Sequence, residues 1–216
     1  KDKIMNWQPP KDKPVYNLDN AYGIVKEKLY TADIKQQCQN SGALLQTDGA
    51  MFIKYLNQDY LINVKSGDVT PKDNSVPLPL REKILMLHYF TLATGAPATG
   101  KQITFRDLPG GLVYYPTFIK RTIQPLLETY GKNASLFIQA GRTMGARKGE
   151  IGDAPIIIDA FPRVPVTFIL WQGDEELNPD LNLLFDANIL AYLEPEDVTI
   201  LCETITWRLV NAAKRA

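Results

Sequence analysis

Two stretches of the chain combine arginine, aromatic residues and backbone-restricting residues in the way an anion-binding site would. They are FRDLPGGLVYYPTF, residues 105–118, and FPRVPVTFILWQGDEEL, residues 161–177. Arg106 and Arg163 each lie near proline or glycine, and proline lowers the entropy lost in holding a charged group at a set angle. Guanidinium groups bind carboxylates and phosphates through charge-assisted hydrogen bonds. We therefore expect both arginines to face a single cleft and to anchor acidic groups there.

The residues that follow Arg106 suggest how that cleft is built. Gly110 and Gly111 stand between a predicted strand and a predicted helix, where a turn needing positive φ is the simplest explanation. Their spacing matches neither the Gly-x-Gly-x-x-Gly nor the Walker phosphate loop. A helix beginning near Tyr115 would nevertheless direct free N–H groups at an anion above the turn. Tyr114 and Tyr115 would point opposite ways in an extended segment, so one lines the pocket and the other is core.

Carboxylates at the two stretches provide candidate bases or ligands. Asp174 and Glu175 follow a predicted strand that ends at Trp171, which we expect on the wall of the same cleft. Carboxylates at a strand end suit Mg²⁺ or Ca²⁺, but the calcium-loop pattern is absent and a solvated turn is the simpler reading. Asp107 either caps its turn, pairs with Arg106, or serves with Glu175 as a candidate general base.

The chain has one histidine and two cysteines, which limits the metal sites and catalytic groups that these residues can form. His88 is the single histidine, on a predicted buried helical stripe with no Asp, Glu or Cys three or four residues away, so we expect a pocket-wall residue. A second histidine is missing for a His-x-x-x-His zinc site, and a Ser-His-Asp triad is disfavoured. Cys38 and Cys202 cannot hold an iron–sulfur cluster, which normally takes four ligands. No metal site is predicted.

Composition disfavours two classes of partner. Lys plus Arg equals Asp plus Glu, at 24 each, so no global field favours nucleic acid or an anionic membrane. No apolar run approaches the ~18 residues of a membrane span, and no apolar segment follows the charged start as in a signal peptide. We expect a cytoplasmic protein.

The order of predicted elements indicates an α+β fold. Residues 1–18 are expected to form an extended arm, and residues 19–216 one α+β domain with antiparallel hairpins and four to five helices. A proline-rich loop near 66–79 would divide the domain if it has two lobes. The segment 181–193 fits either a helix or a strand with a turn. The predicted hairpins span 51–64 and 154–171, and the predicted helices span 19–40, 79–93, 115–130, 133–144 and 196–213.

Two strings of the sequence carry a resemblance to a known family. DLPGG and FPRVP, in this order and at this spacing, resemble the family called domain of unknown function 3786, and LREKILMLHYF is similar to a helix that family carries upstream. The resemblance covers roughly residue 19 to the end. It implies a protein of anaerobic bacteria and archaea, some of which carry an iron–sulfur domain similar to that of the corrinoid iron–sulfur protein of one-carbon metabolism. This chain lacks those clustered cysteines, so it would correspond to the part without the cluster.

Three functions follow as hypotheses. The first is a ligand-binding or accessory module of anaerobic cofactor or one-carbon metabolism, which binds a corrinoid or another tetrapyrrole in an aromatic cleft. The Asp-x-His-x-x-Gly signature of base-off corrinoid binding is missing, since Met86 and Thr91 stand at the two flanking positions around His88. The second is a transferase that uses Asp107 or Glu175 as base. The third is an interaction domain that docks an iron–sulfur protein, and whether the chain is an enzyme stays open.

Overall fold

The structure, a computed structural model, describes residues 17–46, 50–73 and 76–215. These residues form more helix than strand, and every strand pair is antiparallel, which confirms the α+β prediction. Most of the expected N-terminal arm lies outside the described residues. The last two residues of this expected arm belong to the first helix instead, because Asn17 is its N-cap and Leu18 is its first residue.

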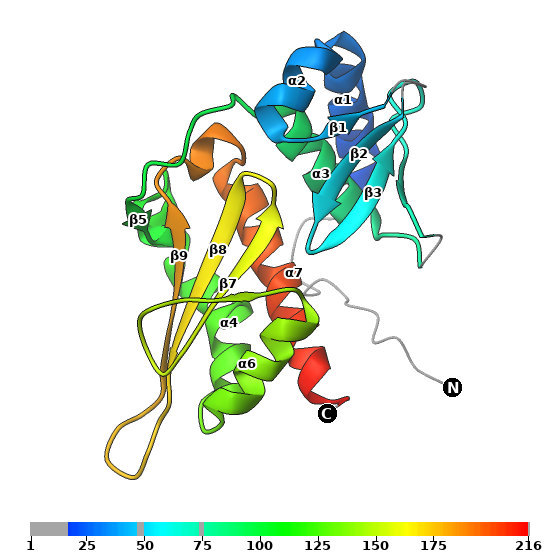
Figure 1. Cartoon of the computed structure of the whole chain (residues 1–216). Helices are drawn as coiled ribbons and strands as arrows, with labels where there is room; N and C mark the ends of the chain where they lie inside the picture. The colour runs from blue at the N-terminus through cyan, green and yellow to red at the C-terminus, as the bar shows by residue number, and fades with distance from the viewer. Residues whose placement is uncertain (1–16, 47–49, 74–75, 216) are drawn as a thin grey trace.

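The first lobe consists of three helices and a four-stranded sheet of order β1-β2-β3-β4 (Figure 1). The predicted hairpin at 51–64 is confirmed. The predicted helix at 19–40 is divided in two, because Ala32 is extended and the carboxylate of Asp33 caps a new helix by accepting from the Gln36 N–H. The elements are α1 (Leu18–Thr31), α2 (Ile34–Ser41), β1 (Leu44–Leu45), β2 (Met51–Tyr55), β3 (Gln58–Ile62), β4 (Val69–Pro71) and α3 (Leu80–Leu92).

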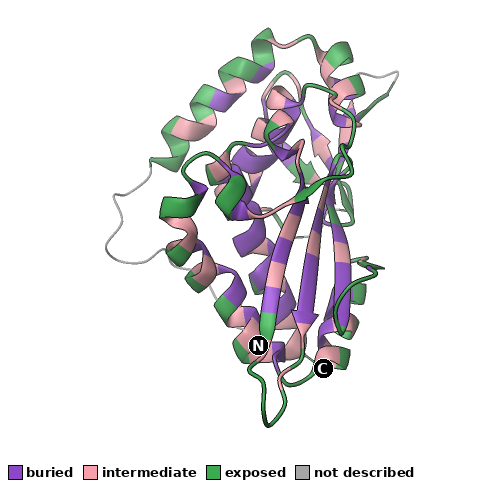
Figure 2. Ribbon diagram, turned by 90° about the vertical axis from the view of Figure 1, so that its left-hand side faces the viewer, coloured by how far each residue is buried: buried purple, intermediate pink, exposed green. Residues whose placement is uncertain are grey.

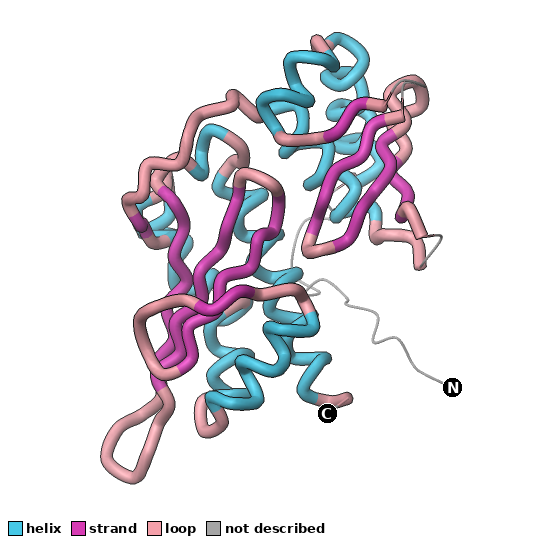
Figure 3. The backbone as a smooth tube through the Cα atoms, in the orientation of Figure 1, coloured by secondary structure: helices cyan, strands magenta, loops and turns pink. Residues whose placement is uncertain are grey.

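The second lobe holds a five-stranded sheet of order β5-β9-β8-β7-β6, with helices packed against it (Figures 1 and 3). The predicted hairpin 154–171 supplies its two longest strands, which are largely buried in Figure 2. The elements are β5 (Gln102–Ile103), η1 (Phe105–Asp107), α4 (Gly111–Arg121), α5 (Ile123–Tyr130), α6 (Ala134–Thr143), β6 (Arg147–Lys148), β7 (Ala154–Phe161), β8 (Val164–Trp171), β9 (Asp180–Asp186), η2 (Ile189–Ala191) and α7 (Pro195–Ala213).

Three boundaries differ from the sequence-based prediction. The helix expected at 115–130 begins at Gly111 and is broken at Thr122, since Pro125 has no N–H to bond the carbonyl four residues earlier. These divided helices raise the helix number above the four to five expected. The passage between the lobes is residues 93–101 rather than 66–79, because α3 lies beyond that loop yet packs on α1 and α2.

An aromatic residue of the second lobe closes the core of the first. Phe161, at the end of β7, stacks on Tyr89 with ring centroids 4.1 Å apart and lies 4.9 Å from the ring of Tyr55. All three side chains are almost fully buried. The backbone N–H of Leu56 also donates to the carbonyl of Ala160 at 3.0 Å. The two lobes therefore share one hydrophobic core.

The carboxylate of Asp186 fastens the passage between the lobes. It accepts hydrogen bonds from the backbone N–H groups of Thr99, Gly100 and Asn188, and from the Thr99 hydroxyl. Burial favours the neutral acid, but these hydrogen bonds outweigh it and lower the pKa of Asp186. The loop before β5 is thus held by one ionised side chain.

We expect Asp186→Asn to lower the free energy of unfolding at neutral pH by about 2 kcal/mol, since charge-assisted hydrogen bonds are lost. A carboxylate whose folded pKa is depressed contributes stability that is fully present above its unfolded pKa near 3.9 and is lost as pH falls through the folded value. Urea unfolding at pH 6 and pH 3 should therefore show the gap between wild type and variant shrinking at pH 3. An equal gap at both pH values would contradict an ionic origin.

Candidate functional site

The structure does not gather the predicted residues into one cleft. Arg163 lies in the turn between β7 and β8, whereas Trp171 is the last residue of β8. At ~3.3 Å per residue, a separation of eight positions corresponds to about 26 Å of extended strand. Arg163 and Trp171 therefore lie at opposite ends of β8, because Arg163 immediately precedes this strand and Trp171 ends it.

Arg163 has a structural neighbour in the first lobe. Its side chain is exposed, and its backbone N–H donates to the hydroxyl of Tyr89 at 3.2 Å. That hydroxyl in turn donates to the carbonyl of Ser41 at 2.6 Å. The FPRVP string thus forms a hairpin turn that docks its backbone and Phe161 onto the first lobe. Packing accounts for this string without a ligand.

The DLPGG string forms the turn from η1 into α4. The carboxylate of Asp107 accepts from the backbone N–H and the hydroxyl of Thr104, at 2.8 and 2.9 Å. These bonds lower the pKa of Asp107, which weakens it as a general base. Gly110 has a positive φ of 71°, as expected of a turn glycine. Gly111 is buried against the carbonyl of Phe105, which leaves no room for a side chain.

Changing Gly111 to Ala should lower the free energy of unfolding by about 1–3 kcal/mol, because overpacking forces the backbone to shift. A Cβ at this position would stand 1.9 Å from the carbonyl oxygen of Phe105, which is backbone and cannot rotate away. Gly23→Ala is the matched control. It lies within α1 with nothing within 4 Å of the added Cβ, so it should stabilise the protein slightly. Thermal unfolding of both variants measures the contrast, and equal effects would refute the steric argument.

Tyr114 and Tyr115 are consecutive residues of a helix, so they do not point to opposite sides of an extended segment as expected. Both are partly buried. The guanidinium carbon of Arg106 lies 4.2 Å from the ring centroid of Tyr115, in a cation–π contact on the surface. The hydroxyl of Tyr114 accepts from Arg121 at 3.0 Å. The two tyrosines therefore serve different charged partners.

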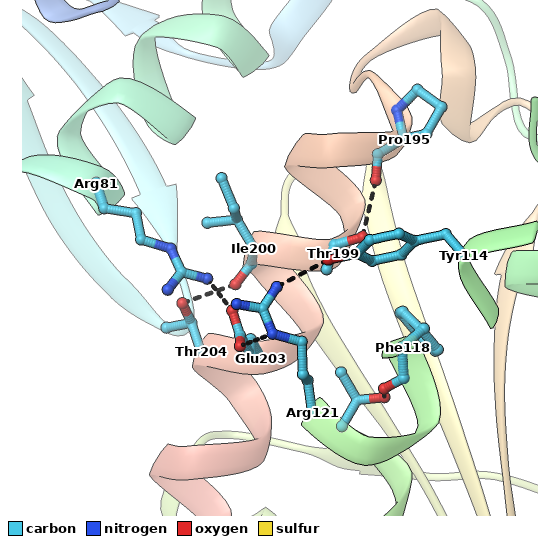
Figure 4. Close-up of polar contacts among 10 residues, drawn as sticks. Arg81, Tyr114, Phe118, Arg121, Pro195, Thr199, Ile200, Glu203 and Thr204 are labelled. Atoms are coloured by element: carbon cyan, nitrogen blue, oxygen red, sulfur yellow. Dashed lines mark hydrogen bonds and ion pairs between the residues drawn. The ribbon is translucent and has the colours of Figure 1, made fainter. Parts of the chain in front are cut away.

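A buried carboxylate on α7 joins helices of both lobes (Figure 4). Glu203 accepts from Arg81 of α3, and its Oε1 lies 2.9 Å from Nε of Arg121 on α4. Glu203 is 4% exposed, and both arginine side chains are 17% exposed. Arg121 then reaches on to Tyr114, so one chain of polar contacts links α3, α7 and α4. Sequence reasoning missed Glu203 because its partners are far apart in the chain.

Two further pairs connect α3 to α7. An Arg208 nitrogen donates to the carboxylate of Glu82 at 2.6 Å, and Nδ1 of His88 lies 2.8 Å from Oδ1 of Asp197. His88 is therefore a half-buried residue with a carboxylate partner. Residues three or four positions from His88 do not include this partner, because Asp197 is 109 positions away in the chain. Asp197 is also part of the capping box that begins α7. These pairs hold α3 against α7 at two positions.

The carboxylates after β8 form a self-contained turn. The carboxylate of Asp174 accepts from the N–H groups of Glu176 and Leu177, both at 2.8 Å. The bond from Leu177, followed by that from Glu176, lowers the pKa of Asp174. Glu175 is exposed in the same turn. Within the described ranges, no three His, Cys, Asp or Glu residues come together in a way that could hold a metal ion.

The described residues line a partly open pocket between α6 and the end of α7. Its volume is about 490 Å³. Leu136, Ala140 and Met144 line it from α6 or the helix end. Arg208, Asn211 and Arg215 line it from the α7 side. None of the residues predicted to bind a ligand is among its lining residues. The sequence signal for this pocket is the spacing of Arg208, Asn211 and Arg215 at intervals of three and four positions, which places them on one helical face.

The described helices include none with the length and apolar character that crossing a bilayer requires.

Comparison with known proteins gives one extensive match. The model of a family described as Domain of unknown function (DUF3786) matches residues 33–208. Among curated proteins, the glutathione biosynthesis bifunctional protein GshAB of Streptococcus thermophilus is 28% identical over 130 residues. That alignment covers 56% of this chain and 17% of GshAB, so it spans a small part of the relative. No solved structure matches.

Proposed function

The chain belongs to the DUF3786 family, and we propose that it is a ligand-binding or accessory module whose binding site is the pocket between α6 and α7. The observation that carries the proposal is the pocket itself. Its volume of about 490 Å³ falls within the ~300–1,000 Å³ typical of small-molecule sites.

The composition of the pocket supports a small organic ligand. The α6 side supplies the apolar Leu136, Ala140 and Met144 with the polar Gln139 and Thr143, and the α7 side supplies Arg208, Asn211 and Arg215 with Ala212. Apolar walls with a few polar groups are typical of sites that bury most of a ligand and fix its orientation. The arrangement of an apolar body with arginine anchors is the one we expected around Arg106 and Arg163, but it is supplied by other residues.

The anaerobic cofactor or one-carbon context stays part of the proposal through the family resemblance alone, and a corrinoid or another tetrapyrrole, which is larger than this pocket, is kept as an alternative ligand that would bind outside it. An iron–sulfur protein remains a proposed partner on the same ground. The transferase alternative has less support, because Asp107 is used by its own capping box and Glu175 lies in an exposed turn. We therefore place the binding hypothesis first.

The first experiment asks whether the pocket binds an apolar anion. The probe is 8-anilinonaphthalene-1-sulfonate, an aromatic sulfonate whose fluorescence rises on apolar binding, titrated into folded protein at neutral pH. Thr143 is exposed and lines the pocket, so Thr143→Trp should fill the pocket and abolish saturable binding. Ser135→Trp, on an exposed α6 position outside the pocket lining, is the control and should bind as wild type.

Native mass spectrometry of protein purified anaerobically from its own host identifies the ligand. A copurifying small molecule that is lost in Thr143→Trp and retained in Ser135→Trp would support the proposal, and a corrinoid mass that Thr143→Trp leaves unchanged would support the alternative ligand. A ligand or probe whose binding Thr143→Trp leaves unchanged would place the site elsewhere. Wild-type protein that binds neither the probe nor any copurified molecule would contradict the proposal.

A further inference from the structure

The two arginines of the pocket differ in how their charge is balanced. Arg208 donates to the carboxylate of Glu82, and its guanidinium carbon lies 5.5 Å from the ring centroid of Tyr55. Burial lowers the pKa of Arg208, but the charge and hydrogen bond of Glu82 together with Tyr55 and Tyr60 outweigh it, and the pKa is raised overall. Arg208 therefore has its counter-ion inside the protein, and it holds α7 against α3.

Arg215 is the unbalanced charge. It is exposed just beyond the end of α7 and lines the pocket. Across the described part of the chain, no carboxylate forms an ion pair with it. Asn211, one turn earlier, adds a neutral amide to the same side. The pocket thus offers one positive charge that an incoming group can satisfy.

The remaining surface of the pocket sets the size and character of the ligand. At the ~30 Å³ that a water molecule occupies in the liquid, 490 Å³ corresponds to roughly sixteen heavy atoms. The α6 side presents Leu136, Ala140 and Met144 beside the polar Gln139 and Thr143, and methionine adapts to flexible apolar chains. A ligand that matches both sides has an apolar body of about this size and one acidic group.

We infer that the α6–α7 pocket selects an amphipathic monoanion, with its acidic group on Arg215 and its apolar body along α6. This inference rests on the proposed function and specifies the class of ligand. A group bearing two negative charges would leave one without a partner, because Glu82 already occupies Arg208.

The test compares decanoate with decanamide, which share the apolar chain and differ in charge. Each is titrated calorimetrically into the full chain at pH 7, and each is used to displace 8-anilinonaphthalene-1-sulfonate. We expect decanoate to bind at least ten-fold more tightly than decanamide. Arg215→Gln should remove this preference by weakening decanoate about ten-fold, with decanamide unchanged, and Thr143→Trp should abolish binding of both.

Lys214→Gln is the matched control, since Lys214 is the neighbouring cation and does not line the pocket. It should keep the full preference for decanoate. Equal affinities of the two probes, a preference that survives Arg215→Gln, or failure of both to bind would overturn the monoanion inference. If the sulfonate probe still binds and Thr143→Trp still blocks it, the proposed function stands. If the sulfonate probe also fails, the proposed function fails with it.

Discussion

Glu203→Ala should lower the free energy of unfolding by about 3–5 kcal/mol, one of the two largest effects we expect from a single substitution in this chain. Removing one partner from a buried ion pair leaves the other charge without compensation in a poorly hydrated site. Here the loss affects both Arg81 and Arg121, whose side chains are 17% exposed and reach the same carboxylate. Urea unfolding followed by circular dichroism measures the change.

Two comparisons isolate the cause. Glu196→Ala removes an exposed carboxylate from the same helix and should cost under about 1 kcal/mol. The triple variant Arg81→Met, Arg121→Met and Glu203→Leu replaces the whole network with apolar side chains and should recover most of the stability. A triple variant no more stable than Glu203→Ala would show that the damage comes from packing around α7 rather than from stranded charge.

Phe161→Ala should also lower the free energy of unfolding by about 3–5 kcal/mol, the usual cost of truncating a buried phenylalanine. Its ring lies between Tyr55 and Tyr89 of the first lobe, so the variant should in addition uncouple the lobes. In a Trp7→Phe background, tryptophan fluorescence comes from Trp171 and Trp207 of the second lobe, whereas far-ultraviolet circular dichroism reports on both lobes. We expect the two urea transitions to coincide in wild type and to separate in the variant.

Phe137→Ala provides the control for this second effect. Phe137 is fully buried and lies 5.2 Å from Tyr130, with both residues in the second lobe. Its truncation should cost a similar free energy while the two transitions remain coincident. Coincident transitions in Phe161→Ala would refute the role of this ring in coupling the lobes.

Local pattern was sufficient for most elements of the fold. The hairpin at 154–171 and the helix from Pro195 were predictable, because each is defined by apolar periodicity within a short window. The ends and interruptions of the helices were not predictable from apolar periodicity. Asp33 acts through one side-chain hydrogen bond, and Pro125 acts through one backbone hydrogen bond that it cannot make. The segment 181–193, left open between helix and strand, is β9 followed by a short 3-10 helix.

The candidate site was far less predictable. Arg106 and Arg163 were chosen for their local surroundings, and those surroundings serve a surface cation–π contact and a docked turn. The partner of His88 is 109 positions away, and the two carboxylate contacts of Glu203 reach other helices. A pocket between two helices also depends on how their faces meet, which neither helix encodes alone. Tertiary neighbours decide these features.

The position of Phe161 has a consequence for how the chain folds during synthesis. The ring that completes the core between Tyr55 and Tyr89 emerges from the ribosome some seventy residues after Tyr89, so the first lobe is made long before it can be sealed. Contacts of such long sequence separation slow folding, because the chain entropy of closing the loop is lost before the contact forms. Until the β7–β8 hairpin appears, an apolar surface containing two tyrosine rings is open to solvent and to other chains. The nascent first lobe is therefore the stage of biogenesis at which this protein is most exposed to aggregation and most suited to chaperone binding.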